Sequence, residues 1–211
     1  MLQQLLWRFD WFQSFRSFAR ATRAPSQVKE WESSGRKGAP PHSIKQKVLK
    51  DYASRFNLRI LVETGTYHGD MIDALFHSFD SLYSIELSVN LYNKAKWRFR
   101  NQPKVKLING DSGEMLAKLV STLDGAALFW LDGHYSAGPT AHGVLSTPIY
   151  NELAHILSAN EKRHVIVIDD ARHFGVEKDY PSIEEITAFV KKSRPDLSVR
   201  VDCDSIQVFP G

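Results

Sequence analysis

Short apolar runs alternate with longer helical patterns along most of this 211-residue chain. The apolar runs cover residues 58–62, 82–85, 105–108, 126–131 and 165–168. Each run is almost continuously apolar, which is typical of parallel strands buried on both faces of a sheet. The pattern between the runs predicts helices near residues 70–78, 89–100, 113–123, 145–158 and 182–193. Repeated β-α-β units need right-handed crossovers, so we predict an α/β fold with a doubly wound, Rossmann-like and mostly parallel sheet.

The end of the chain has a different pattern. Two apolar runs, 197–201 and 206–209, are separated only by Asp202–Ser205. A connection this short cannot contain a crossover helix, so it predicts a C-terminal antiparallel hairpin. We expect helices on both faces of the completed sheet.

The start of the chain indicates a separate organisation. A helical pattern over 44–56 leads into the predicted sheet, and residues 24–43 are rich in Pro, Gly and Ser, which is typical of a connector. We therefore divide the chain into an N-terminal helix and linker, 1–43, and a Rossmann-like domain, 44–211.

Composition narrows the class of protein. A hydrophobic content of 43% with 24% charged residues is ordinary for a globular protein and excludes collagen-like or wholly disordered chains. The single cysteine, Cys203, excludes a disulfide framework and a cysteine-rich zinc module. No apolar run approaches the roughly 18 residues of a membrane span, and the N-terminus lacks the pattern of a secretory signal. We expect a cytoplasmic protein.

The N-terminal segment is basic and aromatic. Residues 1–50 carry ten Lys or Arg and three acidic residues, whereas the rest of the chain has a net charge of −4. Six aromatic residues lie among the first 20: Trp7, Phe9, Trp11, Phe12, Phe15 and Phe18. A helix packed on the domain, a cap over an acceptor site, a homodimer contact and a peripheral membrane contact through residues 1–24 all fit this pattern. No RNA-binding motif is visible, so we expect no nucleic-acid partner.

The first predicted strand ends in an acidic, glycine-containing loop. Its sequence, Glu63-Thr-Gly65-Thr66-Tyr67-His-Gly69, allows a tight turn and close approach of a ligand to the backbone. The glycine spacing differs from the G-x-G-x-x-G motif of phosphate-binding loops. A carboxylate here would repel a pyrophosphate but suit a cationic ligand, which favours S-adenosylmethionine over NAD. An ordinary βα turn with an incidental Glu is the alternative.

Two more strand ends carry polar residues that suit the same ligand. Glu86 follows the second strand, 23 residues after Glu63, where an acid can accept hydrogen bonds from ribose hydroxyls. Asp111 and Ser112 follow the third strand, where an adenine would lie. Either of these two could equally cap the next helix.

Three aspartates follow the fourth and fifth strands. Asp132 ends Phe-Trp-Leu-Asp, and Asp169 and Asp170 end Ile-Val-Ile-Asp-Asp. If the two strands are neighbours, these carboxylates meet at one edge and repel one another unless they are protonated, paired or bound to a metal. Oxygen ligands suit Mg²⁺ better than zinc. In the alternative without a metal, Asp170 caps a turn and Asp169 pairs with Arg172.

The order of these motifs resembles a known enzyme class. E-x-G-x-Y-x-G, then I-E, G-D-S, L-D-G-H and I-D-D, spread over residues 58–170, is similar to the class I S-adenosylmethionine-dependent methyltransferases. Catechol O-methyltransferase and the metal-dependent, macrocin-type sugar O-methyltransferases offer the nearest analogy. The resemblance implies a methyltransferase that transfers a methyl group to a small-molecule hydroxyl of a sugar or catechol-like acceptor.

The resemblance also implies roles for individual residues. The expected donor-binding set is Glu63, Gly65, Thr66, Tyr67, Gly69, Glu86, Asp111, Ser112 and Asp132, and the expected magnesium ligands are Asp132, Asp169 and Asp170. Glu63 and the glycines would surround the methionine part, Glu86 would hold the ribose, and Asp111 with Ser112 would face the adenine. The ion would orient the acceptor and lower the pKa of its hydroxyl.

The chain departs from the catechol enzymes at the expected general base. Those enzymes have a lysine three residues after the first metal-binding aspartate, where this chain has Tyr135, preceded by His134. We expect His134 to act as the base because its unperturbed pKa lies near neutrality, with Tyr135 as the second candidate.

Two other function classes remain open. One is a hydroxylase or oxygenase on the same fold, as in cephalosporin-hydroxylase-like proteins, although the two-histidine, one-carboxylate iron pattern is not evident. The other is a non-catalytic nucleotide-binding module, because a fold does not determine a function.

Overall fold

The structure is a computed structural model that describes residues 22–133, 148–161, 163–178 and 180–211. The aromatic segment of the first 20 residues and the two candidate bases, His134 and Tyr135, lie outside the described residues. Within the described part, no helix is long and apolar enough to cross a membrane.

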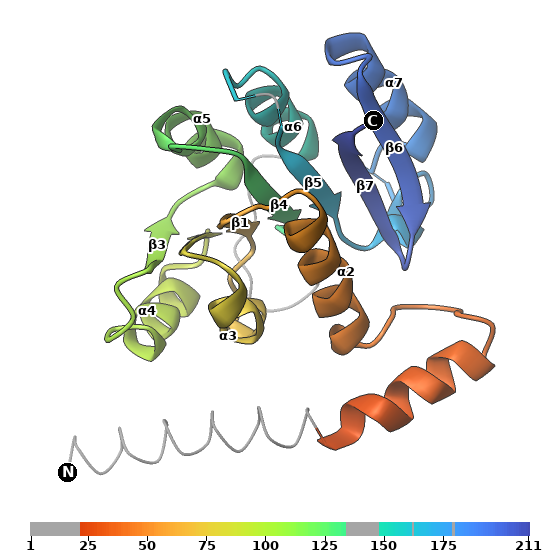
Figure 1. Cartoon of the computed structure of the whole chain (residues 1–211), viewed down its shortest axis with the longest axis horizontal. Helices are drawn as coiled ribbons and strands as arrows, with labels where there is room; N and C mark the ends of the chain where they lie inside the picture. Colours follow the sequence, from red (N-terminus) through yellow and green to blue (C-terminus); the bar gives the residue numbers. More distant parts are fainter. Residues whose placement is uncertain (1–21, 134–147, 162, 179) are drawn as a thin grey trace.

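One seven-stranded sheet forms the centre of the domain, with strand order β3-β2-β1-β4-β5-β7-β6 (Figure 1). The strands are β1 Ile60–Thr64, β2 Ser81–Glu86, β3 Val105–Asn109, β4 Ala127–Leu131, β5 Val165–Ile168, β6 Leu197–Asp202 and β7 Ser205–Pro210. Strands β1 to β5 pair in parallel, whereas β7 pairs antiparallel with both β5 and β6. This arrangement confirms the predicted Rossmann-like sheet and its C-terminal hairpin.

Helices cover both faces of the sheet, as expected (Figure 1). They are α2 His42–Arg55, α3 Asp70–Leu75, α4 Val89–Arg98, α5 Ser112–Thr122, α6 Ile149–Leu157 and α7 Ile183–Ser193, with short 3₁₀ turns η1 Phe76–Ser78 and η2 Ala171–His173. Side chains of α2 and α3 pack on one face with Leu61, Leu128 and Trp130. Side chains of α5, α6 and α7 pack on the other face with Val62 and Phe129.

The mostly apolar strands β1, β4 and β5 lie in the middle of the sheet. All residues of β1, β4 and β5 are buried, because α-helices shield both faces of these strands from water. A shift of one residue would exchange the two core faces, so the alternating packing fixes the register. In that register Thr64 lies beside Leu131, and Leu131 beside Ile168, so the residues after these strands emerge at one edge.

The predicted connector is shorter than expected. Residues 22–33 are helical, and only the stretch from 34 to 41 is irregular. The Pro and Gly residues of this region lie at 25, 35, 38, 40 and 41, so residues 26–34 contain no helix breaker. Trp31 is 7% exposed, and its indole Nε1 donates to the carbonyl of Gly38 over 3.4 Å.

Candidate functional site

The expected site residues that the structure describes lie at the carboxyl ends of the parallel strands. Strands β2 and β4 flank β1 on opposite sides, so the order of connections reverses at β1. In doubly wound sheets, ligands bind in the crevice outside the strand ends at this reversal. The loop after β1 and the residues after β4 meet there.

Two glycines shape the loop between β1 and α3. Gly65 has a left-handed φ of 82°, and a Cβ placed on it would lie 2.4 Å from the carbonyl oxygen of Asp132. Gly69 has a φ of 74°, and a Cβ there would lie 2.6 Å from the ring of Phe99. Only glycine satisfies both the conformation and the close approach. Gly65 thereby holds the loop directly against the end of β4.

Glu63, the last acid of β1, is buried in a chain of hydroxyl groups. Ser84 Oγ donates to Oε2 of Glu63 over 2.5 Å, and Thr66 Oγ1 lies 2.6 Å from Ser84 Oγ. The carboxyl is 2% exposed. Burial raises its pKa to about 8, with a further contribution from nearby Glu86, although the bond from Ser84 acts in the opposite direction. Glu63 therefore carries a proton at neutral pH unless a cation lies next to it.

Glu86, at the end of β2, joins two loops through backbone hydrogen bonds. Its carboxylate accepts from the backbone N–H of Tyr67 over 2.8 Å and of Ser88 over 2.9 Å. Tyr67 adopts a left-handed φ of 48°, which aims this N–H at the carboxylate, and its side chain is 52% exposed. A carboxylate offers about four acceptor positions, so Glu86 retains capacity for ligand hydroxyls.

Asp111 and Ser112 lie where the third strand passes into α5. Asp111 caps this helix, because its side chain accepts from the backbone N–H of Gly113 over 2.8 Å. Ser112 is the first residue of α5 and is half-buried. The capping role considered for Asp111 is therefore present, and it leaves one carboxylate oxygen for other partners.

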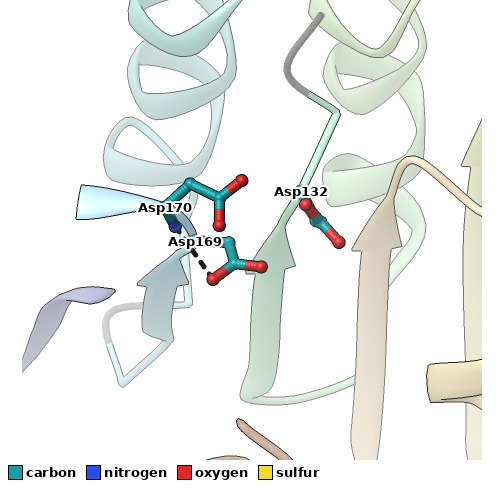
Figure 2. A group of neighbouring side chains, drawn as sticks. All are labelled: Asp132, Asp169 and Asp170. Atoms are coloured by element: carbon teal, nitrogen blue, oxygen red, sulfur yellow. Dashed lines mark hydrogen bonds between the residues drawn. The ribbon is translucent and has the colours of Figure 1, made fainter. Parts of the chain in front are cut away.

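The three aspartates predicted to meet do meet (Figure 2). Asp132 follows β4, and Asp169 and Asp170 follow the adjacent β5. One carboxylate oxygen from each lies within 4.8 Å of the other two. Asp169 is 1% exposed and accepts from the backbone N–H of Asp170 over 2.8 Å. Asp170 itself adopts a left-handed φ of 56°, which turns its side chain toward the other two.

Two cations contact this cluster, one from a distant helix and one that follows Asp170 by two residues. The ammonium Nζ of Lys45, in the first turn of α2, contacts Oδ2 of Asp169 and lies 3.3 Å from Oδ1 of Asp170. Arg172 donates from Nη1 to the same Oδ1 of Asp170 over 2.9 Å. The alternative in which Asp169 pairs with Arg172 is therefore wrong, because Lys45 takes that place and Arg172 pairs with Asp170. Asp170 also precedes η2 without capping it through its side chain.

Burial and charge act in opposite directions on these groups. Burial raises the pKa of Asp132 well above its ordinary value, and the neighbouring Asp169 adds to the shift. Burial also raises the pKa of Asp169 to about 6, against the attraction of Lys45. For Asp170, Lys45 and Arg172 outweigh burial and lower the pKa. For Lys45, the two carboxylates outweigh burial and raise the pKa, so this side chain is a cation at neutral pH.

The tip of the C-terminal hairpin supports Arg172. Asp204 accepts from the backbone N–H of Arg172 over 2.9 Å and contacts Nη1 of the same residue with its other oxygen. The backbone carbonyl of Asp204 accepts from Ala171 over 2.8 Å. His173, the next residue, contacts Glu177 through Nδ1. The hairpin therefore holds Arg172 next to Asp170 from outside the parallel strands.

Glu152, on α6, is a second buried acid that the sequence analysis missed. It is fully buried, and neither carboxylate oxygen makes a hydrogen bond of ordinary geometry in the structure. Burial raises its pKa to about 7, although the hydroxyls of Ser112 and Thr64 lie close enough to lower it in part. Glu152 therefore lies beneath the same edge of the sheet, behind the end of β1 and the start of α5.

Lys45 and Glu152 could not be singled out from the sequence. Lys45 is one of three lysines in α2, and nothing in the local pattern separates it from Lys47, which pairs with Asp51 at the surface. Glu152 lies in an amphipathic helix, where one acid among apolar residues is ordinarily assigned to the exposed side. Ser84, inside β2, gave no signal because isolated serines are common in strands.

The donor set of the cluster fits a divalent ion of the magnesium type. Three oxygen ligands from separate carboxylates converge, and Mg²⁺ prefers a few carboxylates with the remaining positions left to water or substrate. Histidine does not join these three ligands within the described residues, so the iron pattern expected of an oxygenase is not assembled there.

Comparisons with known proteins give the fold a context. No protein-family model matches this chain, and no curated protein sequence matches it either. Solved structures do match. The O-methyltransferase from Bacillus cereus, in complex with S-adenosylhomocysteine, is 13% identical with a TM-score of 0.61, over 90% of this chain and 91% of that one.

Two further structures agree. The O-methyltransferase TomG from Streptomyces achromogenes, in complex with S-adenosylmethionine, is 16% identical with a TM-score of 0.58, over 89% of each chain. The methyltransferase PaMTH1 from Podospora anserina, bound to S-adenosylhomocysteine, is 16% identical with a TM-score of 0.55, over 88% of this chain and 87% of that one. The chain therefore has the fold of the S-adenosylmethionine-dependent O-methyltransferases, and the resemblance inferred from its motifs is confirmed at the level of the fold.

Proposed function

We propose that this protein transfers a methyl group from S-adenosylmethionine to a hydroxyl oxygen of a small-molecule acceptor, with a divalent metal ion at the acceptor. One observation carries the proposal: Gly65 holds the acidic, glycine-containing loop after β1 against the backbone of Asp132, the first residue of the carboxylate cluster. A donor on that loop and an acceptor at the cluster would then be neighbours, as direct transfer between them requires.

The donor side of the site suits a cationic ligand that carries a ribose. Glu63 is buried near Glu86, so a positively charged donor beside these two acids would favour the ionised form of Glu63. Glu86 holds the loop through Tyr67 and has acceptor capacity for two ribose hydroxyls. Asp111 and Ser112 would face the adenine. The solved O-methyltransferases with this fold, which contain S-adenosylmethionine or S-adenosylhomocysteine, support the same donor.

On the acceptor side, Asp132, Asp169 and Asp170 would hold the ion. When bound, such an ion supplies a Lewis acid that orients the acceptor oxygen and lowers the pKa of its hydroxyl. In the transfer, the oxygen forms a bond to the methyl carbon while the sulfur–carbon bond breaks, and S-adenosylhomocysteine leaves. The proton of the hydroxyl passes to a base, for which His134 and then Tyr135 remain the candidates.

The first test is donor binding. We expect S-adenosylhomocysteine to bind the full chain in isothermal titration calorimetry, and Glu86→Gln to weaken binding by at least about tenfold, because a charged hydrogen-bond acceptor is lost. The control is Glu114→Gln, an exposed acid in the first turn of α5. If the wild-type chain is folded and does not bind the compound, the proposed donor is wrong.

The second arm of the same test measures transfer. Sugar and catechol acceptors are incubated with isotope-labelled donor, with and without Mg²⁺, and Asp169→Asn is compared with wild type. We expect turnover that a chelator abolishes and that Asp169→Asn lowers by about a hundredfold or more, with donor affinity retained. Full activity in a chelator would contradict the metal requirement alone.

A further inference from the structure

Lys45 places a positive charge inside the acidic cluster. It lies in α2, 124 residues before Asp169, and its Nζ contacts Oδ2 of Asp169 and lies 3.3 Å from Oδ1 of Asp170. The side chain is only 15% exposed, and Nζ lies 5.9 Å from the centre of the Trp130 ring on β4. Lys47, two residues further along the same helix, is 72% exposed and contacts only Asp51 by salt bridge.

Lys45 contacts two of the three carboxylates that would hold a metal ion. Asp169 and Asp170 provide two of the three converging carboxylates, and Lys45 contacts both. Magnesium binds carboxylate oxygens at about 2.0–2.1 Å. An ion at that distance from the same carboxylates would lie within a few ångströms of the ammonium, where two cations repel strongly.

Arg172 does not compete in the same way. It touches only Asp170 in the cluster, and Asp204 holds it from the opposite side through both its backbone N–H and its guanidinium. Among the described residues, the ion pairs of Lys45 are to Asp169 and Asp170, and its flexible side chain can move aside without movement of its helix. Lys45 is therefore the exchangeable cation of the two.

We propose that Lys45 is an internal counter-ion that holds the Asp132–Asp169–Asp170 cluster in its metal-free form, and that a divalent ion binds only as the Lys45 ammonium leaves Asp169. The inference rests on the metal site of the proposed function. It adds that the ammonium of Lys45, on α2, competes with the metal ion for the carboxylates. It predicts that the wild-type chain binds a divalent ion more weakly than its three carboxylates alone would.

The test is metal binding without turnover. Mn²⁺ is titrated into the full chain and followed by electron paramagnetic resonance, for wild type, Lys45→Met, Lys45→Arg and Lys47→Met. We expect Lys45→Met to bind Mn²⁺ at least about tenfold more tightly, because a cation close to the site is removed. Lys45→Arg, which keeps the charge, should remain within about threefold of wild type, as should Lys47→Met.

A second measurement on wild type covers the case in which Lys45→Met does not fold. The amines are labelled with a limiting amount of an acylating reagent, with and without Mg²⁺, and each lysine is quantified by mass spectrometry. We expect labelling of Lys45 to rise several-fold with Mg²⁺ while labelling of Lys47 stays constant. Once Lys45 leaves the carboxylates, its nitrogen is accessible and loses its proton more readily, and the neutral amine is the form that is acylated.

Equal Mn²⁺ affinity of folded wild type and Lys45→Met would overturn the proposal, as would unchanged labelling of Lys45 at saturating Mg²⁺. A folded Lys45→Met that binds no Mn²⁺ would also overturn it, since the cluster would then not be a metal site. Binding of S-adenosylhomocysteine, measured on the same samples, separates these failures from failure of the proposed donor.

Discussion

Two groups of buried acids lie at the same edge of the sheet and are compensated in different ways. Around β1 and β2, Ser84 and the backbone N–H groups of Tyr67 and Ser88 serve Glu63 and Glu86. At the ends of β4 and β5, charges compensate the aspartates: Lys45 comes from α2, and Arg172 is held in place by the hairpin. The first group is satisfied by neutral hydrogen-bond donors on β2 and the loops after β1 and β2. The second is satisfied by two cations, of which Lys45 comes from a distant helix.

This difference bears on how each group of acids would bind a cation. Glu86 keeps its carboxylate within neutral hydrogen bonds, and the protonated Glu63 would ionise when a positively charged donor molecule lies beside it. The cations at the aspartate cluster already cancel most of its charge, so another cation has to displace one of them. Under the proposed function, the first group would receive a cationic ligand directly, and the second would exchange one cation for another.

The largest effect that we expect in this comparison is on the pH dependence of stability. Folded protein keeps a proton on Glu63 up to about pH 8, whereas the ordinary pKa of this group is 4.5. Between these values the folded state binds more protons than the unfolded state, so the free energy of unfolding falls as pH rises, by about 5 kcal/mol at most. Glu63→Gln should flatten this part of the profile in urea denaturation series from pH 4.5 to 8.5.

The matched control for this prediction is Glu114→Gln, whose acid is exposed on α5 and should leave the profile unchanged. If the free energy of unfolding of Glu63→Gln falls with pH as steeply as that of wild type, then Glu63 is ionised in the folded protein. The contrast between the two acid groups would then be wrong.

The second effect concerns the contact that joins the two groups. A methyl group on Gly65 would lie 2.4 Å from the carbonyl oxygen of Asp132, in a backbone region that side chains rarely adopt. We expect Gly65→Ala to lower the free energy of unfolding by about 3 kcal/mol and to abolish binding of S-adenosylhomocysteine, because the backbone of either the loop or β4 must shift.

Substitutions at two other glycines separate the effect of backbone conformation from the effect of the contact with Asp132. Gly35 has a similar φ of 76° with nothing within 4 Å of the added carbon, so Gly35→Ala reports conformational strain alone, about 1 kcal/mol. Gly125→Ala, where the added carbon also meets nothing, should be close to neutral. A loss for Gly65→Ala no greater than that for Gly35→Ala would show that the contact with Asp132 is unimportant.

The smallest effect is at the hairpin. Asp204→Asn keeps an oxygen for the backbone N–H of Arg172 but removes the charge opposite its guanidinium. Because Arg172 is partly exposed, we expect a loss of only about 1 kcal/mol in thermal or urea denaturation. Asp196→Asn, which disrupts a more exposed pair with Arg194, should cost less. Equal losses would mean that the hairpin gives Arg172 no special support.

The architecture could be predicted closely because it depends on patterns that are local in sequence. The continuous apolar run at 165–168 and the helical pattern near 182–193 need no distant partner to be recognised. Parallel strands bring their carboxyl ends to one edge, so the sequence predicts that Asp132 and Asp169 lie close together if their strands are neighbours. The connector at 24–43 was misjudged over its helical part, because Pro and Gly at its edges dominated its composition.

The sequence by itself thus determined the order of strands and helices, the glycine loop after β1 and the meeting of three aspartates. Only the tertiary structure decided which cations pair with those aspartates, and that Glu152 is buried near Thr64 and Ser112. The physical reason is that the periodicity of helices and strands depends on neighbouring residues. The partner of a buried charge depends instead on which side chains the packing of distant elements brings close to it. Lys45 and Lys47 look alike along the chain, and the docking of α2 on the sheet alone separates them.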